Sequence, residues 1–177
     1  MVDAHAAIEG FLAAREIEYE KTERGYAVVL PGTHKLKTVC NLIPGAHALR
    51  VEAFVIRQPD ENREEVWAYL LRKNAGMYGV SFAIDAAGDV YLTGRMPLGV
   101  LDEDELDRLL GAVLTYADEN FDPLLELGFA SAIRREWAWR VSRGESLANL
   151  AAFEHLVAEP GAAEGQVGDS GASITRQ

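Results

Sequence analysis

The side chains best suited to nucleophilic or metal chemistry are four histidines and a single cysteine: His5, His34, His47, His155 and Cys40. No two of them repeat as a close pair on one helix face. His34, Cys40 and His47 are separated by intervals of six and seven residues, a spacing that no zinc motif uses. We therefore expect surface imidazoles, a buried structural thiol at Cys40, and neither a metal nor a cofactor.

Motifs of known enzymes are missing from the sequence. It contains no G-x-S-x-G nucleophile elbow, no protease-like cysteine signature and no phosphate-binding glycine loop. The acidic run at 102–105, with Asp107, lacks the ligand spacing and the glycine of an EF-hand, and acids at a helix start are explained by capping and by the helix dipole. We predict no catalytic residues and a protein that is not an enzyme. A site that the fold assembles from these residues is the alternative left open.

A basic cluster near the C-terminal end is the other chemical candidate. It consists of Arg134, Arg135, Arg140 and Arg143, beside Trp137 and Trp139. Such a cluster could hold a phosphate, a nucleotide or an acidic peptide, with Arg134, Arg135 and Arg140 at its centre. The alternative is an amphipathic helix with Trp137 buried and its arginines paired to the acidic helix before it. The acidity of that preceding helix favours the second interpretation.

The charge balance excludes several classes of protein. The chain has 28 acidic and 17 basic residues and a net charge of −11, which argues against a nucleic acid as partner. No apolar run approaches the roughly 18 residues of a membrane span. The N-terminus carries Asp3 and Glu9 where a signal peptide would carry Lys or Arg. Cys40 has no second cysteine to pair with, which fits a reducing compartment. With a length of 177 residues, these features predict a soluble, cytoplasmic, single-domain protein.

Hydrophobic periodicity predicts the elements that must position these residues. We expect an amphipathic helix over 3–15, followed by extended segments over 18–22, 26–30, 36–43 and 48–57. A second helix should begin at Asn62, which forms a capping box with Glu65. Strands over 78–84 and 89–93 and a long helix over 103–126, capped by Asp102, complete the predicted elements. Strands and helices do not alternate singly, which disfavours a parallel Rossmann-type sheet. The predicted class is α+β, an antiparallel sheet of order α-β-β-β-α-β-β-α, with three or four strands in the first run, helices on one face and a C-terminal helical extension.

The strand over 48–57 indicates a surface where a partner could dock. Its core positions alternate with Arg50, Glu52, Phe54 and Ile56, so the second face is polar at one end and apolar at the other. Phe54, Ile56 and Tyr91 are therefore candidate peptide-binding residues on the face away from the helices. The competing interpretation is that the C-terminal helices cover this face. The sequence gives no register and leaves both open.

Residues 66–114 also resemble a known family. The residues that carry the resemblance are Leu70-Leu71-Arg72-Lys73-Asn74, Val80–Asp85, Gly88–Leu92, Met96-Pro97-Leu98 and the helix from Asp102. A helix ending in Leu-x-x-Asn, a strand ending in Asp, a glycine turn, a strand and an acid-capped long helix resemble the YbjN family. The related type III secretion chaperones (CesT-like) share this layout, which by element order covers residues 3–127.

The resemblance implies a compact α+β unit without catalytic residues. Type III chaperones are small, acidic and usually homodimeric, and they wrap an extended segment of a client. Some YbjN-like proteins are described as stress or sensory-transduction regulators. The resemblance thus implies a protein or peptide client and allows a homodimer. The extension after Gly128 departs from the pattern and could cover the surfaces that chaperones use.

The chain divides into three predicted segments, and two functions are compatible with them. We expect a YbjN or chaperone-like domain over 1–128, a helical extension packed on it over 129–158, and a flexible tail over 159–177. The predicted function is a non-enzymatic chaperone-like or regulatory protein that binds a protein or peptide partner. The alternative is a small-ligand or phosphate-binding regulator that uses the helix around Arg134–Arg143.

Overall fold

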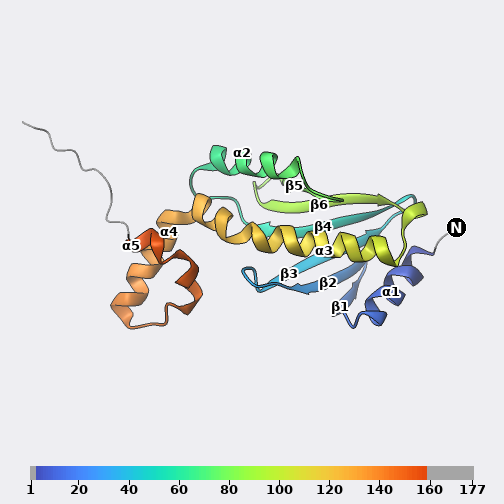
Figure 1. Ribbon diagram of the computed structural model, residues 1–177, viewed down its shortest axis with the longest axis horizontal. Coiled ribbons are helices and arrows are strands. Elements are labelled where there is room, and N and C mark those ends of the chain that lie inside the picture. The colour runs from blue at the N-terminus through green and yellow to red at the C-terminus, as the bar shows by residue number, and fades with distance from the viewer. Residues whose placement is uncertain (1–2, 159–177) are drawn as a thin grey trace, which may run out of the picture. The chain divides into compact units, whose positions relative to one another are not determined.

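The computed structural model of the protein describes residues 3–158, so the tail predicted over 159–177 lies outside the described residues. Its contacts form two compact units, one up to Ala130 and one from Ser131. The first unit contains all the strands of the described chain (Figure 1). The packing of the C-terminal extension on this unit stays a prediction. Within residues 3–158, no helix is both long and apolar enough to cross a membrane.

The first unit is built on one antiparallel sheet of six strands in the order β1-β2-β3-β4-β6-β5. The strands are β1 (Tyr19–Thr22), β2 (Gly25–Pro31), β3 (Lys37–Pro44), β4 (Ala48–Ile56), β5 (Ser81–Ile84) and β6 (Val90–Pro97). The predicted α+β class is confirmed, and the first run has four strands. The tight β5–β6 turn forms as its sequence indicates, because Gly88 adopts a φ of +86° that other residues rarely take.

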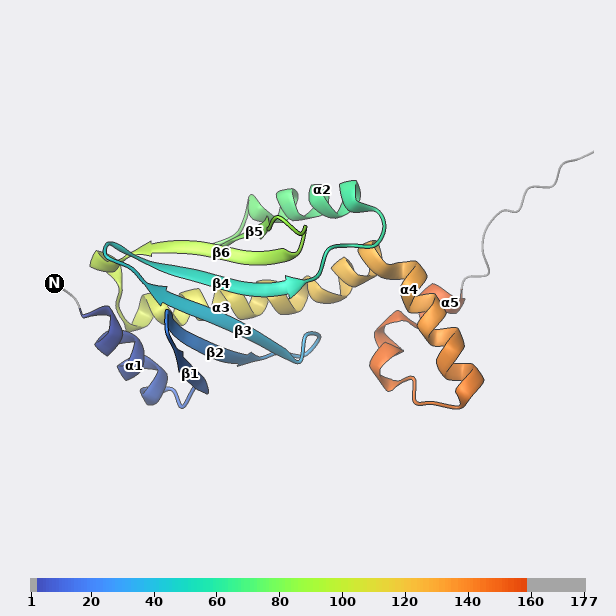
Figure 2. The ribbon, with the colours of Figure 1, turned by 180° about the vertical axis from the view of Figure 1, so that it is seen from behind.

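Helices cover one face of this sheet. They are α1 (Ala4–Ala14), α2 (Arg63–Asn74) and α3 (Glu103–Glu119), with a short 3₁₀ turn, η1 (Leu98–Val100), before α3. Figure 1 shows α3 running across the sheet, and Figure 2 shows the sheet in front of α3. The fully buried side chains of β4, Leu49, Val51, Ala53 and Val55, point to the helix-covered face. The opposite face of the sheet is called the open face below.

The long helix predicted over 103–126 is two helices in the structure. It begins as expected, with the Asp102 carboxylate accepting the Glu105 N–H at 2.8 Å. It ends at Glu119, and α4 (Phe121–Arg143) follows after Asn120. The buried Asn120 amide donates to the Tyr116 carbonyl at 2.8 Å and accepts the Tyr69 hydroxyl at 2.7 Å. A local apolar period does not reveal this polar junction between three helices.

A kink in α4 at Phe129 is explained by contacts from a distant loop. The Gly128 carbonyl accepts the N–H groups of Asp60 and Glu61 at 3.0 and 3.2 Å, and the Leu127 carbonyl accepts the Asn62 amide at 3.0 Å. These carbonyl oxygens bond outside their own helix, and Phe129 leaves helical geometry with a φ of −143°. The expected capping box at Asn62 is therefore wrong: Asn62 makes no cap bond.

The last residue of α2 binds the outer edge of the sheet. The Asn74 side chain accepts the Phe82 N–H at 2.7 Å and donates to the Phe82 carbonyl at 3.1 Å. A side-chain amide thus takes the place that a neighbouring strand would occupy on β5. This gives a physical reason for the asparagine in the Leu-x-x-Asn pattern.

Candidate functional site

The open face carries a row of apolar side chains that crosses five strands. Val29 lies opposite Val39, and Tyr91 lies between Phe54 and Ala83. The pairing of Cys40 with Ala53 brings Val39 beside Phe54. Val39 and Phe54 are each 40% exposed, and the Phe54 and Tyr91 rings meet edge to face at 5.5 Å. Val29, Val39, Phe54, Tyr91 and Ala83 are called the apolar row below.

Ile56 is not part of the apolar row. The pairing of β4 with β6 shifts between Phe54 and Ile56, so that Val55 and Ile56 are both buried. A β-bulge of this kind adds one residue and reverses the alternation beyond it. The structure corrects the predicted placement of Ile56, which is 3% exposed, because strict alternation ends one residue earlier.

The loop between β2 and β3 places a cation beside the apolar row. One carboxylate oxygen of Asp118 accepts the backbone N–H groups of Thr33, His34 and Lys35 at 2.8, 2.8 and 2.9 Å. The Lys35 ammonium then lies 5.5 Å from the centre of the Phe54 ring, and burial lowers the pKa of this lysine. Asp118 thereby fixes a charged group at one end of the exposed aromatic surface.

His34 adds a pH-dependent contact to the same loop. Its Nδ1 lies 2.6 Å from the Asp122 carboxylate, and this hydrogen bond and charge raise the pKa of His34. A histidine whose pKa is raised by folding stabilises the fold below its unfolded pKa, and the contribution disappears as the pH rises through the folded value. We expect His34→Gln to lower the melting temperature more at about pH 5.5 than at about pH 8.5, on either side of the ordinary histidine pKa.

Thermal unfolding of the wild type and the variant in matched buffers measures this difference. Asp122→Asn is the control, because adding His34→Gln to it should cause only the small further pH-dependent loss that the Asp118 charge contributes. An equal effect of His34→Gln at both pH values contradicts the prediction.

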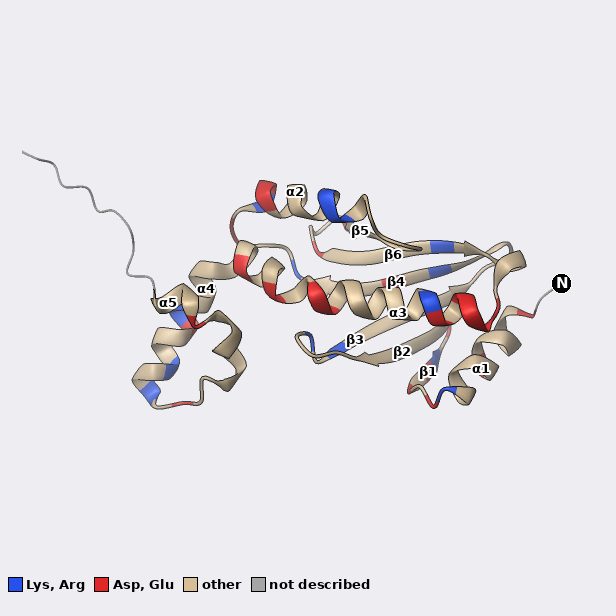
Figure 3. Cartoon of the chain, viewed as in Figure 1, with Lys and Arg blue, Asp and Glu red and all other residues tan. Residues whose placement is uncertain are grey.

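The other end of the open face is basic. Arg50 of β4 lies directly opposite Arg95 of β6, and both line a pocket of about 400 Å³ together with Arg24 and His47. These four residues are called the basic pocket below. Figure 3 shows the blue segments of β4 and β6 at this level of the sheet. The alternation along β4 predicts a polar surface at this end, and the cross-strand register brings Arg50 and Arg95 together.

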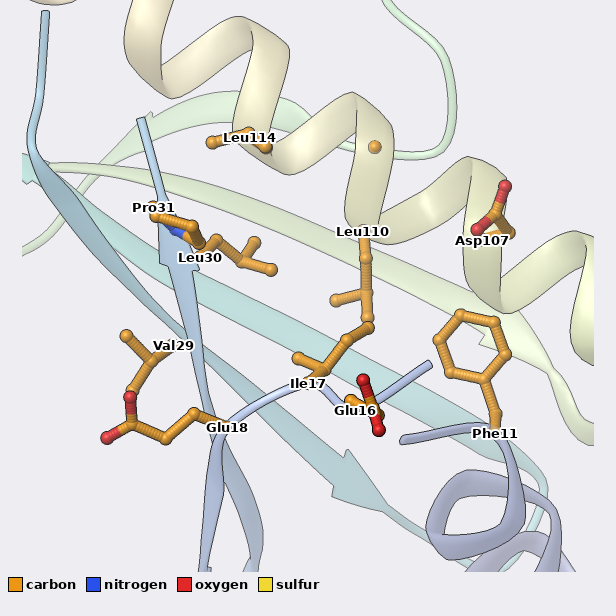
Figure 4. Close-up of a pocket in the computed structure, with 11 residues that line it drawn as sticks. Phe11, Glu16, Ile17, Glu18, Val29, Leu30, Pro31, Asp107, Leu110 and Leu114 are labelled. Atoms are coloured by element: carbon orange, nitrogen blue, oxygen red, sulfur yellow. The ribbon is translucent and has the colours of Figure 1, made fainter. Parts of the chain in front are cut away.

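A third feature is an apolar groove of about 510 Å³ between α1, β2 and α3 (Figure 4). Figure 4 shows the Ile17, Leu30 and Leu110 side chains around this groove, with the carboxylates of Glu16 and Asp107 beside Phe11. The Asp107 carboxylate pairs with Arg15 at 2.7 Å. The groove was not predicted, because it is assembled from elements nearly a hundred residues apart.

The arginines predicted as an anion site lie in the second unit, which contains η2 (Ala148–Phe153) and α5 (His155–Ala158). Arg134 donates to the Leu156 carbonyl at 2.9 Å. Arg140 donates to the Glu136 carboxylate at 2.7 Å and to the Ser146 carbonyl at 3.0 Å. These bonds tie the C-terminal segment to α4, while Arg135 is exposed. Anion binding by Arg134, Arg135 and Arg140 stays a prediction.

Cys40 lies apart from the histidines, of which His5 and His47 line one pocket. Cys40 is fully buried in the core, and burial raises the pKa of its thiol to about 12. The histidines have different partners: His5 bonds to the Tyr26 hydroxyl at 2.8 Å, and His34 bonds to the Asp122 carboxylate. Among the described residues, no group of three His, Cys, Asp or Glu side chains could hold a metal ion.

The antiparallel sheet with its covering helices is a fold that this chain shares with a chain of a complex from the type III secretion system. A chain of the heterodimeric ExoU-SpcU complex of Pseudomonas aeruginosa superposes with a TM-score of 0.51 and 21% identity over 67% of this chain and 98% of its own. The ExsC-ExsE complex gives a TM-score of 0.50 and 17% identity, over 70% and 97%. YbjN of E. coli gives 0.51 and 12%, over 68% and 92%.

Residues 4–126 match the YbjN family, described as "Putative bacterial sensory transduction regulator", and the chain belongs to this family. Its relatives include an uncharacterised protein of Mycobacterium tuberculosis, 51% identical over 84% of this chain and 85% of that protein. Another, of Mycobacterium leprae, is 53% identical over 76% of this chain and 73% of that protein. The predicted family is thus confirmed.

Proposed function

We propose that this protein is a non-enzymatic binding protein that holds an extended segment of a protein partner on the open face of its sheet. The observation that carries the proposal is the apolar row, in which Val39 and Phe54 stay 40% exposed although the opposite face of the same strands is fully buried. Contiguous exposed apolar side chains on a sheet mark docking surfaces for chains or subunits. Phe54 and Tyr91 are the proposed contact residues.

The fold comparisons support a protein as the partner. Two of the similar structures are complexes of two proteins, ExoU-SpcU and ExsC-ExsE. They share the fold with this chain, and the proposed partner is carried over from them by analogy. A regulatory role in the sense of the family description is compatible with such a surface, because a regulator can act by binding another protein.

Replacing Phe54 by an acid tests the proposal. Phe54→Asp should weaken partner binding by about 30-fold or more, the usual cost of removing a central aromatic side chain, while the fold persists because the residue is partly exposed. Full-length protein and variant are used to capture partners from the native host lysate. Mass spectrometry identifies a near-stoichiometric partner, and its affinity is then measured with purified proteins.

Leu71→Asp is the matched control, since it makes the same kind of change at a 71% exposed residue of α2 away from the open face. It should bind the partner like the wild type. Equal binding by Phe54→Asp and wild type would show that the open face is not the docking site. The open face could instead bind a second copy of this chain. Light scattering would then show a dimer in the wild type and a monomer in Phe54→Asp.

The alternative function is a small-ligand or phosphate-binding regulator that uses Arg134, Arg135 and Arg140. It receives less support, because two of these arginines already bond to carbonyls within the second unit. A rise in melting temperature with nucleotides that is lost in Arg135→Gln, and that Phe54→Asp leaves unchanged, would favour it.

A further inference from the structure

The basic pocket is unusual in an acidic chain. Three of the 17 basic residues line one pocket in a protein of net charge −11. Arg50 and Arg95 lie directly opposite each other on neighbouring strands, an arrangement of like charges that destabilises a sheet. The pocket therefore concentrates positive charge at a cost to the fold.

The charge of the pocket is only partly neutralised within the protein. The Glu52 carboxylate lies 3.2 Å from Nε of Arg50. The guanidinium groups of Arg24 and Arg95 have no hydrogen-bond or ion-pair partner among residues 3–158. A bound anion would relieve the repulsion, and a carboxylate matches a guanidinium through two parallel hydrogen bonds.

The pocket and the apolar row lie on the same face at a fixed separation. Phe54 and Arg50 are four residues apart on β4, which corresponds to about 13 Å along an extended strand. A row of polar side chains, formed by Asn41, Glu52 and Thr93, separates them. An extended chain lying along β4 would span this distance with about four residues of its own.

We infer that the partner segment carries an acidic side chain about four residues from an apolar or aromatic one, with the carboxylate in the basic pocket and the apolar side chain on the apolar row. The inference rests on the proposed function and adds the chemistry of the partner. Charge complementarity selects this occupant: an acidic protein repels other acids over most of its surface and accepts one at this pocket.

Selection of short random peptides on the immobilised full-length protein tests the inference. The recovered peptides should be enriched in pairs of an apolar residue and an Asp or Glu four positions apart. A selected peptide and its Asp→Asn version are then compared by calorimetry. Arg50→Gln/Arg95→Gln should weaken the acidic peptide about tenfold and leave the Asn version unchanged.

Arg72→Gln/Lys73→Gln is the control, because it removes the same charge from exposed residues of α2. It should bind both peptides like the wild type. Enrichment of apolar residues without acids, lost in Phe54→Asp, would overturn the inference and leave the proposed function standing. If no peptide is enriched and Phe54→Asp leaves partner capture unchanged, the inference and the proposed function are both contradicted. A melting-temperature rise with inorganic phosphate, without any preference for acidic peptides, would assign the pocket to a free anion and also overturn the inference.

Discussion

Cys40 of the folded protein should react with iodoacetamide about a thousandfold more slowly at about pH 8 than an ordinary thiol. The thiolate is the reacting form, and burial raises the pKa of Cys40 to about 12. Its side chain is also 0% exposed, at the centre of β3. Alkylation is expected to follow unfolding, so its rate, measured by mass spectrometry, reports how often β3 opens.

Two comparisons make this result decisive. In urea, the single cysteine should be labelled at the rate of a free thiol, because the unfolded chain no longer shields it. Leu71→Cys provides a second thiol at an exposed site on α2, which should be labelled rapidly in the folded protein. If Cys40 is labelled as fast as the introduced cysteine without denaturant, the prediction that folding protects the Cys40 thiol from alkylation is wrong.

Gly94→Ala should lower the free energy of unfolding by about 3 kcal/mol, the upper end of the usual cost of overpacking. A Cβ at Gly94 of β6 would lie 2.3 Å from the Gly79 carbonyl oxygen and 2.9 Å from Cγ1 of Val80. The first of these atoms belongs to the backbone, so the loop before β5 must move as a whole. Urea unfolding followed by circular dichroism measures the loss.

Gly10→Ala is the matched control with the opposite expected sign. A Cβ at Gly10, inside α1, would meet no atom within 4 Å. The change should raise the free energy of unfolding by about 1 kcal/mol, because alanine favours a helix more than glycine does. Equal effects of the two substitutions would show that the close approach at Gly94 does not limit the fold.

The parts of the fold that were predicted correctly depend on contacts between residues near in sequence. The Asp102 cap involves a residue three positions away, and the turn at Gly88 closes a two-stranded hairpin. The wrong predictions concern residues whose contacts come from an element distant in sequence. Asn62 looks like a capping residue, but its amide binds Leu127, which lies 65 positions away, and a local pattern has no access to that bond.

In the candidate site, too, the features set by local sequence were predicted correctly and those set by distant strands were not. Alternation along β4 placed Phe54 on the open face, and the structure puts it there beside Tyr91. Ile56 was misplaced because a bulge is not encoded in the alternation itself. The Arg50–Arg95 pair was missed because it depends on which strands are neighbours, and β6 follows β5 in sequence but lies beside β4.

The bonds from Asn74 to β5 also oppose the edge-to-edge association of such sheets. An open sheet can grow by adding strands of other molecules, which is how many aggregates and fibrils begin. At β5, a foreign strand would first have to displace both bonds between Asn74 and Phe82. At the opposite end, β1 has only four residues and carries Glu20 and Lys21. With both edges protected against polymerisation, the chain can expose apolar side chains on the face of its sheet without offering a template for fibril growth.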